Sequence, residues 1–435
     1  MLLLNGVILS VIVIVILSLL RLNVIFGLIA ASITAGLVAG VSLTDTIQLM
    51  VQGMSGQLET ALSYILLGMF AVMIAKSEIT SLLVNKLLVV LRGKRGILLM
   101  SIATAACLSQ NVVPVHIAFI PILIPPLLTL FTKMQIDRRA VACALTFGLQ
   151  APYLMLPAGF GLIYHQIVVS EMGKAGMTIA VTEFPKAMLI PGIGMIIGLL
   201  VALFISYRKS RTYQMISKDI ENEEEKQVLR FTKRHAFTLV AILLALTVQL
   251  LTKSLIIGSL SGIVCLFVFR VVPWNLGDDV VQRGVAMMGF IAFVILLASG
   301  YATVLKETGA VQQLVGSGVE YFGQNRFLAS VIMLLIGLVI TIGIGSSFGT
   351  VPIIAAIFVP LCAGLGFSVL ATAALIGTAG ALGDAGSPAS DSTLGPTSGL
   401  NADGQHHHIW DTCVPTFLHY NIPLFFFGLL AAFLL

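Results

Sequence analysis

Charge is scarce in this sequence. Lysine, arginine, aspartate and glutamate make up 10% of the 435 residues, whereas a soluble domain contains roughly 25% of such residues. Hydrophobic residues make up 58%, and apolar runs long enough to span a bilayer recur along the chain. A soluble fold of this length is therefore excluded. The net charge of +5 does not indicate nucleic-acid binding, because the basic residues lie in short loops, as in inner-membrane proteins.

Paired cysteines and familiar catalytic signatures are also lacking. The five cysteines are scattered without a C-x-x-C pair, so we interpret them as small packing residues rather than metal ligands or disulfides. No H-E-x-x-H zinc signature and no ATP-binding P-loop occurs, which argues against an enzyme and against an ATP-driven pump. The N-terminus lacks the basic region and cleavage site of a signal peptide, so segment 2–20 is predicted to stay as a first span.

Fourteen apolar segments are candidate membrane spans. They are 2–20, 24–41, 58–75, 97–113, 115–131, 140–158 and 187–206 in the first half, and 236–252, 255–271, 285–304, 327–344, 351–365, 368–384 and 416–435 in the second. The hydrophilic segment 207–235 separates the two sets, and its basic residues predict a cytoplasmic linker. Re-entrant hairpins are an alternative for 115–131 and 351–365.

The two halves carry matching motifs about 230 to 240 residues apart, a spacing typical of transporter repeats. Phe26-Gly27 matches Ile257-Gly258, and the segment 109–114 matches 347–352. We predict a first transmembrane repeat over 1–206, a linker over 207–235 and a second repeat over 236–435.

The second repeat is predicted to be inverted relative to the first, because each half has an odd number of crossings. Charge supports this prediction: the first half has a basic turn at 92–95, whereas the second-half segment 306–326 keeps only Lys306 and Arg326 as basic residues. The protein is expected in a bacterial cytoplasmic membrane with both termini outside.

The segment 383–393 carries the strongest functional signal. It follows an apolar run and contains Asp384, Asp391, three serines and a threonine beside glycine and proline. Broken backbone within hydrocarbon survives only inside protein or beside water, and ionisable side chains there usually mark an ion or substrate path. The segment therefore predicts part of a binding site in a transport protein.

Three further polar interruptions lie at 109–114, 148–153 and 343–352. Proline and glycine free backbone carbonyls, and with serine, threonine and asparagine oxygens these can form a site for Na⁺. Asp384 occupies the position that Gln150 holds in the first half, which suits a group that binds a cation and a proton in turn. A helix kink or a helix cap is the alternative for any single interruption.

The internal run His406-His407-His408 invites a metal interpretation. Consecutive histidines cannot all reach one ion from a regular element, so a loop over the transport path or a solvated loop is preferred. His116, just after Pro114, is a candidate for the path, and a structural histidine is the equal alternative.

The last third of the chain is specific enough to suggest a family. The motifs are Gly349-Thr350-Val351-Pro352-Ile353-Ile354-Ala355-Ala356, Gly383-Asp384-Ala385-Gly386-Ser387-Pro388-Ala389-Ser390-Asp391-Ser392-Thr393 and Asp411-Thr412-Cys413-Val414-Pro415-Thr416. They resemble the NhaC-type Na⁺/H⁺ antiporter family and, within it, the YuiF-like branch of proposed histidine or basic amino-acid permeases.

The resemblance implies an all-α polytopic membrane fold of the ion-transporter superfamily, with two inverted-topology repeats, discontinuous helices and re-entrant hairpins. It points to a set of cation or substrate contacts: Ser109, Asn111, Ser346, Ser347, Thr350, Asp384, Ser387 and Asp391. We assign cation coupling to Ser109, Asn111, Ser347, Thr350, Asp384 and Asp391. The expected substrate contacts are Asn111, His116, Gln150, Tyr153, Ser346, Thr350 and Ser387.

The sequence thus favours a cation-coupled secondary transporter that imports an amino acid, with histidine as the first candidate, by alternating access. His116, Gln150 and Tyr153 fit an organic zwitterion, whereas Na⁺/H⁺ antiport without an organic substrate is the alternative. The expected partners are the amino acid, a monovalent cation (Na⁺ or H⁺) and the lipid bilayer. No nucleic acid and no cofactor beyond the coupling ion is expected, and a homodimer is left open. A channel is disfavoured because its filter would need uniform lining, whereas these halves differ in charge at matched positions.

Overall fold

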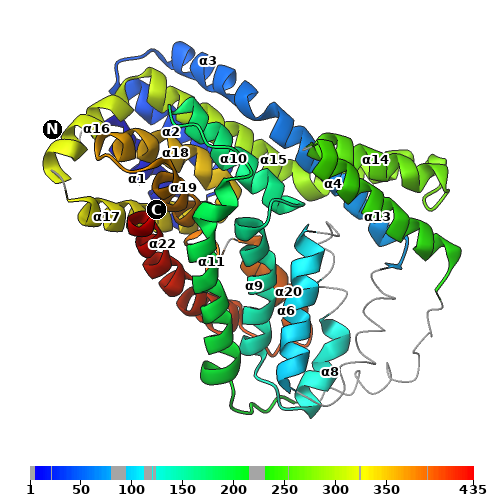
Figure 1. Cartoon of the computed structure of the whole chain (residues 1–435). Helices are drawn as coiled ribbons and strands as arrows, with labels where there is room; N and C mark the ends of the chain where they lie inside the picture. Colours follow the sequence, from blue (N-terminus) through cyan, green and yellow to red (C-terminus); the bar gives the residue numbers. More distant parts are fainter. Residues whose placement is uncertain are drawn as a thin grey trace.

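The computed structural model describes residues 5–20, 22–79, 95–111, 120, 124–214, 231–252, 254–322, 325–388 and 390–435 (Figure 1). All regular elements within these ranges are helices, which confirms the all-α polytopic fold. Six of the described helical segments are long and apolar enough to cross a membrane, and the bent pair Arg138–Met155 and Phe160–Lys174 makes a seventh if it is counted as one span. Five more apolar helices are only 10–17 residues long, so the described part of the chain contains fewer full-length crossings than the fourteen predicted segments. His116 lies outside the described residues, as do residues 115–119 and 121–123 of the predicted segment 115–131.

The first group of helices combines the opening helices of both halves of the chain. Its first-half members are α1 (Gly6–Leu19), α2 (Val24–Val38), α3 (Leu43–Met54) and α4 (Leu58–Lys76). The second-half members are α13 (Lys233–Thr252), α14 (Leu255–Val268), α15 (Gly277–Glu307) and the amphipathic α16 (Ala310–Phe322). Short polar caps start several of these helices; Asn23 accepts from the amide of Ile25, and Ser254 from that of Ile257.

The pairing of these helices is matched between the halves. α3 and α4 run on through a single 3-10 turn as a 34-residue segment, and α15 with its leading turn has the same length. α4 packs against α15 and α14, while α15 packs against α4 and α2. This reciprocal pattern is expected of a duplicated chain, and the domain boundaries at 206 and 235 stay a prediction.

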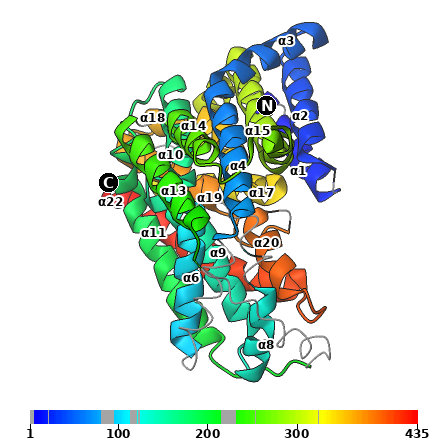
Figure 2. The ribbon, with the colours of Figure 1, turned by 90° about the vertical axis from the view of Figure 1, so that its right-hand side faces the viewer.

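The second group combines the helices that follow the opening helices in each half of the chain. The first-half helices are α6 (Arg95–Asn111), α8 (Pro125–Lys133), α9 (Arg138–Met155), α10 (Phe160–Lys174) and α11 (Phe184–Val201), which continues as a π-turn to Ser206. The second-half helices are α17 (Arg326–Ile344), α18 (Ser347–Gly364), α19 (Val369–Ala381), α20 (Asp391–Leu400), the short α21 (Val414–Thr416) and α22 (Ile422–Leu434), with π-helical turns at His408–Cys413 and Phe417–Asn421 on either side of α21. Figures 1 and 2 show α3, α4 and α15 above, with α6, α8 and α9 below. α10 was not predicted from the sequence.

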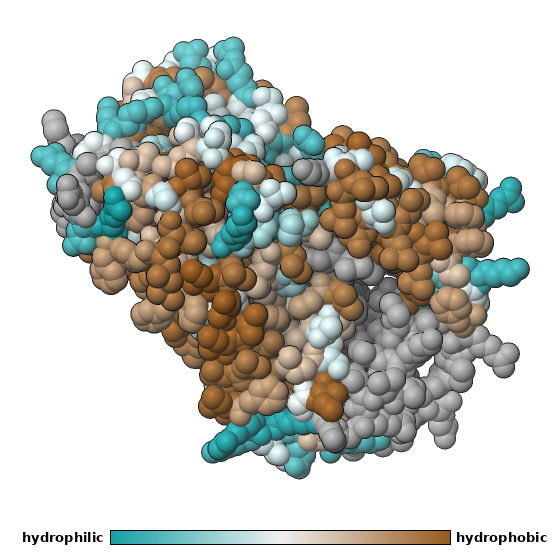
Figure 3. Space-filling view, in the orientation of Figure 1, coloured by the Kyte–Doolittle hydropathy of each residue, from teal (hydrophilic) through white to brown (hydrophobic). Residues whose placement is uncertain are grey.

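The outer surface is that of a membrane protein. In Figure 3 a hydrophobic band over α11 separates hydrophilic surfaces at either end of the molecule. Exposed apolar side chains continue this band along α11 and α22, including Leu189, Ile193, Phe426 and Leu430. Such a continuous apolar belt is expected where helices face lipid.

Candidate functional site

Three helix breaks converge on the centre of the second group. α9 and α10 are separated at 156–159 and bent by 48°. α17 ends at Ile344, and the φ of +72° at its C-cap residue Gly345 allows α18 to start at Ser347 behind the cap residue Ser346. α19 and α20 are separated by 382–390, where Gly383 has a φ of +90°. A Cβ on Gly383 would lie 2.8 Å from the carbonyl oxygen of Leu338, so this turn requires glycine.

A small cavity lies where these breaks meet. It offers about 40 Å³ to water-sized molecules, enough for a few waters or a small cation since one water needs roughly 10–15 Å³. The lining residues are Tyr64, Leu149, Tyr153, Phe160, Gly345, Ser346, Ser347, Phe348, Asp384, Ser390, Asp391 and Ser392. Half-helix ends around a polar cavity are the arrangement that secondary transporters use for ions and substrates.

Asp384 is the centre of the hydrogen bonds in this cavity. Its Oδ2 accepts from the Tyr153 hydroxyl at 2.7 Å, the Ser347 hydroxyl at 3.0 Å and the Ser392 hydroxyl at 3.3 Å. Its Oδ1 accepts from the Ser390 hydroxyl at 2.5 Å. The residue is only 5% exposed, and no ion pair within the described parts of the chain includes it. Hydroxyl dipoles therefore surround this buried carboxyl group without a fixed positive charge.

Two helices, α18 and α20, have their N-termini at this cavity. Ser346 caps α18 by accepting from the amide of Gly349, and Ser390 caps α20 by accepting from the amide of Ser392 at 3.0 Å. Asp391, the first residue of α20, also lines the cavity, and its side chain is exposed there. Because Ser390 donates to Asp384 while it caps α20, the state of the carboxyl group is linked directly to the start of a helix.

Two buried amide side chains hold the loop that carries Asp384. Gln150 on α9 donates to the carbonyl of Ala381 at 2.8 Å. Asn421 accepts from the amide of Gly383 at 2.9 Å and donates to the carbonyl of Ala385 at 2.6 Å. These bonds satisfy backbone groups that the break in the helix leaves open, as an apolar environment requires. Gln150 therefore lies behind the loop and does not line the cavity.

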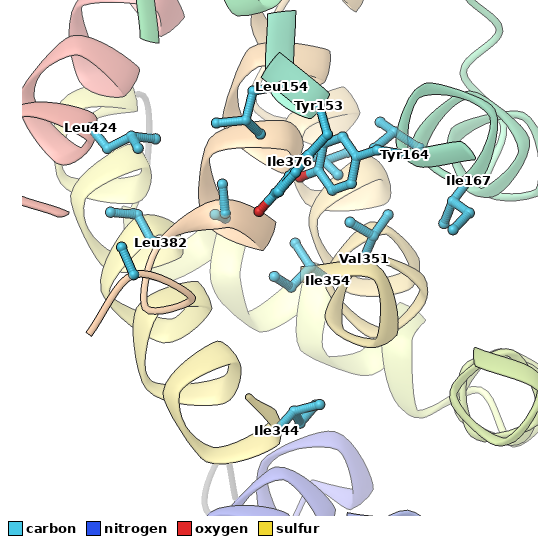
Figure 4. Packing of buried hydrophobic residues seen from close by; sticks show 14 of the residues in the cluster. Tyr153, Leu154, Tyr164, Ile167, Ile344, Val351, Ile354, Ile376, Leu382 and Leu424 are labelled. Carbon is cyan, nitrogen blue, oxygen red and sulfur yellow. The ribbon is translucent and has the colours of Figure 1, made fainter. Parts of the chain in front are cut away.

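An aromatic wall faces the carboxyl groups. The rings of Tyr64 and Phe160 each pack edge-on to Phe348, with centroids 5.7 and 6.4 Å away. Tyr153 lies against Tyr164 with centroids 5.1 Å apart, and Figure 4 shows both rings among buried apolar side chains such as Ile376. This packing fixes the orientation of the Tyr153 hydroxyl toward Asp384 and Ser347.

The structure brings five of the predicted site residues to the cavity: Tyr153, Ser346, Ser347, Asp384 and Asp391. Three others do not line the cavity, and their hydroxyls donate to backbone carbonyls: Ser109 to Ala106, Thr350 to Ser346 and Ser387 to Ile342. The side chain of Asn111 lies outside the described part of the structure, as does His116.

Sequence reasoning missed several lining residues, namely Tyr64, Leu149, Phe160, Gly345, Phe348, Ser390 and Ser392. Ser390 and Ser392 stand within the segment that the sequence analysis singled out, so their proximity to Asp384 was a usable signal. For Tyr64 the signal was weaker: a phenol near the middle of an otherwise apolar span.

The letters Gly345-Ser346-Ser347-Phe348-Gly349 fit the hydrolase pattern G-x-S-x-G. That pattern needs a turn from a strand to a helix and a histidine base. Here the segment joins two helices, and the Ser347 hydroxyl forms hydrogen bonds with Tyr153 and Asp384. The segment is therefore a helix start in the site and carries no nucleophile elbow.

The histidine loop packs against helices that lead to the cavity. His408 contacts the Thr397 hydroxyl at 2.7 Å through Nδ1 and the carbonyl of Pro388 at 3.0 Å through Nε2. His406 Nε2 lies 2.7 Å from the Thr412 hydroxyl. Burial lowers the pKa of His406 to about 4, so this imidazole is neutral at pH 7.

The same end of the molecule holds a buried ion pair. Arg138 donates to both carboxylate oxygens of Asp403 at 2.6 Å, and the side chain of Arg138 is fully buried. Burial by itself would raise the pKa of Asp403, but the hydrogen bonds from Arg138 bring it below its ordinary value. The start of the linker contacts this end, because Arg211 pairs with Asp411 at 2.7 Å and the Tyr213 hydroxyl accepts from the amide of Arg138.

Broken helices around a carboxyl-centred cavity in an all-helical membrane fold define a secondary transporter. Two family models match the chain: one described as the Na⁺/H⁺ antiporter family over residues 144–429, and one described as the Na⁺-H⁺ antiporter family over residues 5–91. The chain belongs to the Na⁺/H⁺ antiporter family, and its resemblance to the NhaC-type members is confirmed.

Bacterial relatives match over nearly the whole chain. An uncharacterized membrane protein of Vibrio parahaemolyticus is 49% identical over 443 residues, covering 99% of this chain and 100% of the relative. An uncharacterized membrane protein of Haemophilus influenzae is 47% identical, covering 98% and 99%. The Bacillus subtilis protein named "Putative amino acid transporter YuiF" is 44% identical, covering 99% and 100%.

Two solved structures share the fold at low sequence identity. MtrF of Neisseria gonorrhoeae, described as illuminating a class of antimetabolite efflux pumps, superposes with a TM-score of 0.64 at 16% identity, covering 91% of this chain and 86% of MtrF. The YdaH transporter of Alcanivorax borkumensis gives a TM-score of 0.63 at 16% identity, covering 90% and 88%. These neighbours are transporters rather than enzymes and belong to the same fold class.

Proposed function

We propose that this protein is a cation-coupled secondary transporter in which Asp384 binds a monovalent cation and a proton in turn, and that the coupled cargo is an amino acid, with histidine as the first candidate. The observation that carries the proposal is the shell of four hydroxyl donors around a buried carboxyl group that has no basic partner among the described residues. A buried carboxylate without a positive partner is costly, and a bound cation or proton removes that cost.

The four hydroxyl groups around Asp384 can stabilise both the ionised carboxylate and a bound cation. Each hydroxyl rotates about its C–O bond, so it can donate to an ionised carboxylate or turn its lone pairs toward a cation. Ser347 and Ser390 sit at the starts of α18 and α20, respectively. A change in the charge of Asp384 therefore alters the hydrogen bonds at these two helix N-termini. In this way ion binding would favour one arrangement of the helices over another.

The same cavity presents groups that are complementary to the carboxylate and to the ammonium group of an amino acid. The N-termini of α18 and α20 favour a substrate carboxylate, and the exposed Asp391 side chain favours an ammonium group. The name of the YuiF relative supports an amino acid as cargo. Histidine is the first cargo to test, imported across the bacterial cytoplasmic membrane with Na⁺ or H⁺.

Na⁺/H⁺ exchange without an organic substrate is the second candidate. The volume of the cavity favours it, because about 40 Å³ accommodates a small cation with water but not a histidine. Under this alternative, Asp384 alone exchanges Na⁺ for H⁺, and the cavity need not widen.

Purified protein in liposomes separates the two candidates. With an inward Na⁺ or H⁺ gradient, uptake of radiolabelled histidine that collapses with the gradient supports import. Na⁺-driven proton efflux reported by an internal pH dye, without histidine uptake, supports antiport. Absence of both fluxes, in vesicles where the protein is folded and oriented, would contradict cation coupling.

A further inference from the structure

Tyr64 is a cavity residue that neither the family motifs nor the sequence analysis assign. It lies on α4, whereas every other described lining residue belongs to α9 or to segments that follow it. α4 packs mainly against α14 and α15, in the first helix group. Tyr64 therefore reaches the site from a different part of the molecule than Asp384 and its hydroxyl shell.

The Tyr64 hydroxyl has no hydrogen-bond partner in the described structure, although the side chain is only 1% exposed. Buried hydroxyl groups are normally paired, and an unpaired one requires an explanation. Other buried tyrosines of this chain follow the rule: Tyr153 bonds to Asp384, Tyr164 to the carbonyl of Gly377, and Tyr301 to Ser10 at 2.6 Å.

The surroundings of Tyr64 indicate what would pair with it. Its ring is held edge-on by Phe160 and Phe348, with centroids 5.9 and 5.7 Å away, so the hydroxyl cannot swing toward another group without disturbing the wall. Asp384 and Asp391 line the same cavity as Tyr64. An occupant of the cavity between those carboxyl groups and the aromatic wall is the available partner.

We propose that the Tyr64 hydroxyl oxygen is a ligand of the cation that Asp384 binds, either directly or through one water of its hydration shell. This inference rests on the proposed function, and it adds a contact from the first helix group. Such a contact exists only while the Tyr64 ring lies against Phe160 and Phe348, so it ties cation affinity to one arrangement of the two helix groups.

The test compares Tyr64→Phe with wild type in the full-length protein. Removing an unpaired oxygen leaves the packing of the ring intact, so thermal unfolding without Na⁺ should be unchanged or slightly higher in temperature. The Na⁺ concentration that gives half-maximal thermal stabilisation, and the one that gives half-maximal flux in liposomes, should both rise about fivefold or more, the effect of losing one polar contact. The maximal flux at saturating Na⁺ should change less than twofold.

Tyr301→Phe is the matched control, because it removes a buried phenol oxygen that does have a partner, Ser10. It should lower the unfolding temperature and leave the Na⁺ dependence unchanged. If Tyr64→Phe shows the Na⁺ dependence of wild type, or unfolds at a clearly lower temperature without Na⁺, Tyr64 is not a cation ligand. If wild type itself shows no response to Na⁺ or to a proton gradient, the proposed function fails, and this inference fails with it.

Discussion

Replacing Asp384 by asparagine removes the charge from the site while it keeps nearly the same shape. The amide oxygen can occupy the place of Oδ2 and keep its three donors, Tyr153, Ser347 and Ser392. The amide nitrogen then faces Ser390, whose oxygen can accept from it. The hydrogen-bond network therefore survives in a neutral form.

The expected effect on stability is small because two large terms oppose each other. Hydrogen bonds to a charged group contribute about 1.5–3 kcal/mol and neutral ones about 0.5–1.5 kcal/mol, so losing the charge at four bonds costs roughly 4–6 kcal/mol. Removing a desolvated charge returns several kcal/mol. We expect the free energy of unfolding of Asp384→Asn to lie within about 2 kcal/mol of wild type.

The expected effect on transport is large, because an amide neither ionises nor exchanges a proton for a cation. In liposomes, Asp384→Asn should abolish both gradient-driven flux and the Na⁺ response, whereas thermal unfolding in detergent should show a folded protein. Asp45→Asn, at an exposed carboxylate that accepts from Ser42, is the control and should transport as wild type does. An unaltered pH and Na⁺ dependence in Asp384→Asn would remove this residue from the mechanism.

Three further predictions concern Asp403, Asn421 and His406. Asp403→Asn leaves the guanidinium of Arg138 buried without a counter-charge, so it should lower the free energy of unfolding by about 3 kcal/mol, measured by thermal unfolding; a loss below about 1 kcal/mol would contradict the buried pair. Asn421→Ala leaves two buried backbone groups of the Asp384 loop unpaired and should cost about 2–4 kcal/mol in stability as well as weaken Na⁺ affinity in the flux assay. The pKa of His406 is lower in the folded protein than its ordinary 6.5, so the unfolded state takes up a proton first and stability falls as the pH drops from 6.5 toward 4. His406→Gln should remove about 2 kcal/mol of that loss at pH 5, which parallel melts of the two proteins at pH 5 and pH 7.5 would show.

The sequence alone decided the fold class and the importance of one segment. Hydropathy sets these outcomes, because a chain with 10% charge must place its apolar runs in lipid and close its backbone hydrogen bonds within helices. Asp384 could be singled out for the same reason, since a carboxyl group beside broken backbone in an apolar setting is too costly to keep without a function. The NhaC-type resemblance of the last third was visible in consecutive letters.

The tertiary structure decided which polar residues share one cavity. Ser109, Thr350 and Ser387 have suitable oxygens, yet none of them lines the cavity, and each donates to a backbone carbonyl. α10 also escaped prediction, since a break at 156–159 divides a span whose two parts cross at 48°. Tyr64 on α4 lines the same cavity as Asp384, and Asn421, in the turn before α22, bonds to the amide of Gly383 in the Asp384 loop. Residue spacing determines neighbours along one helix, whereas packing between helices determines these meetings, and no local pattern encodes them.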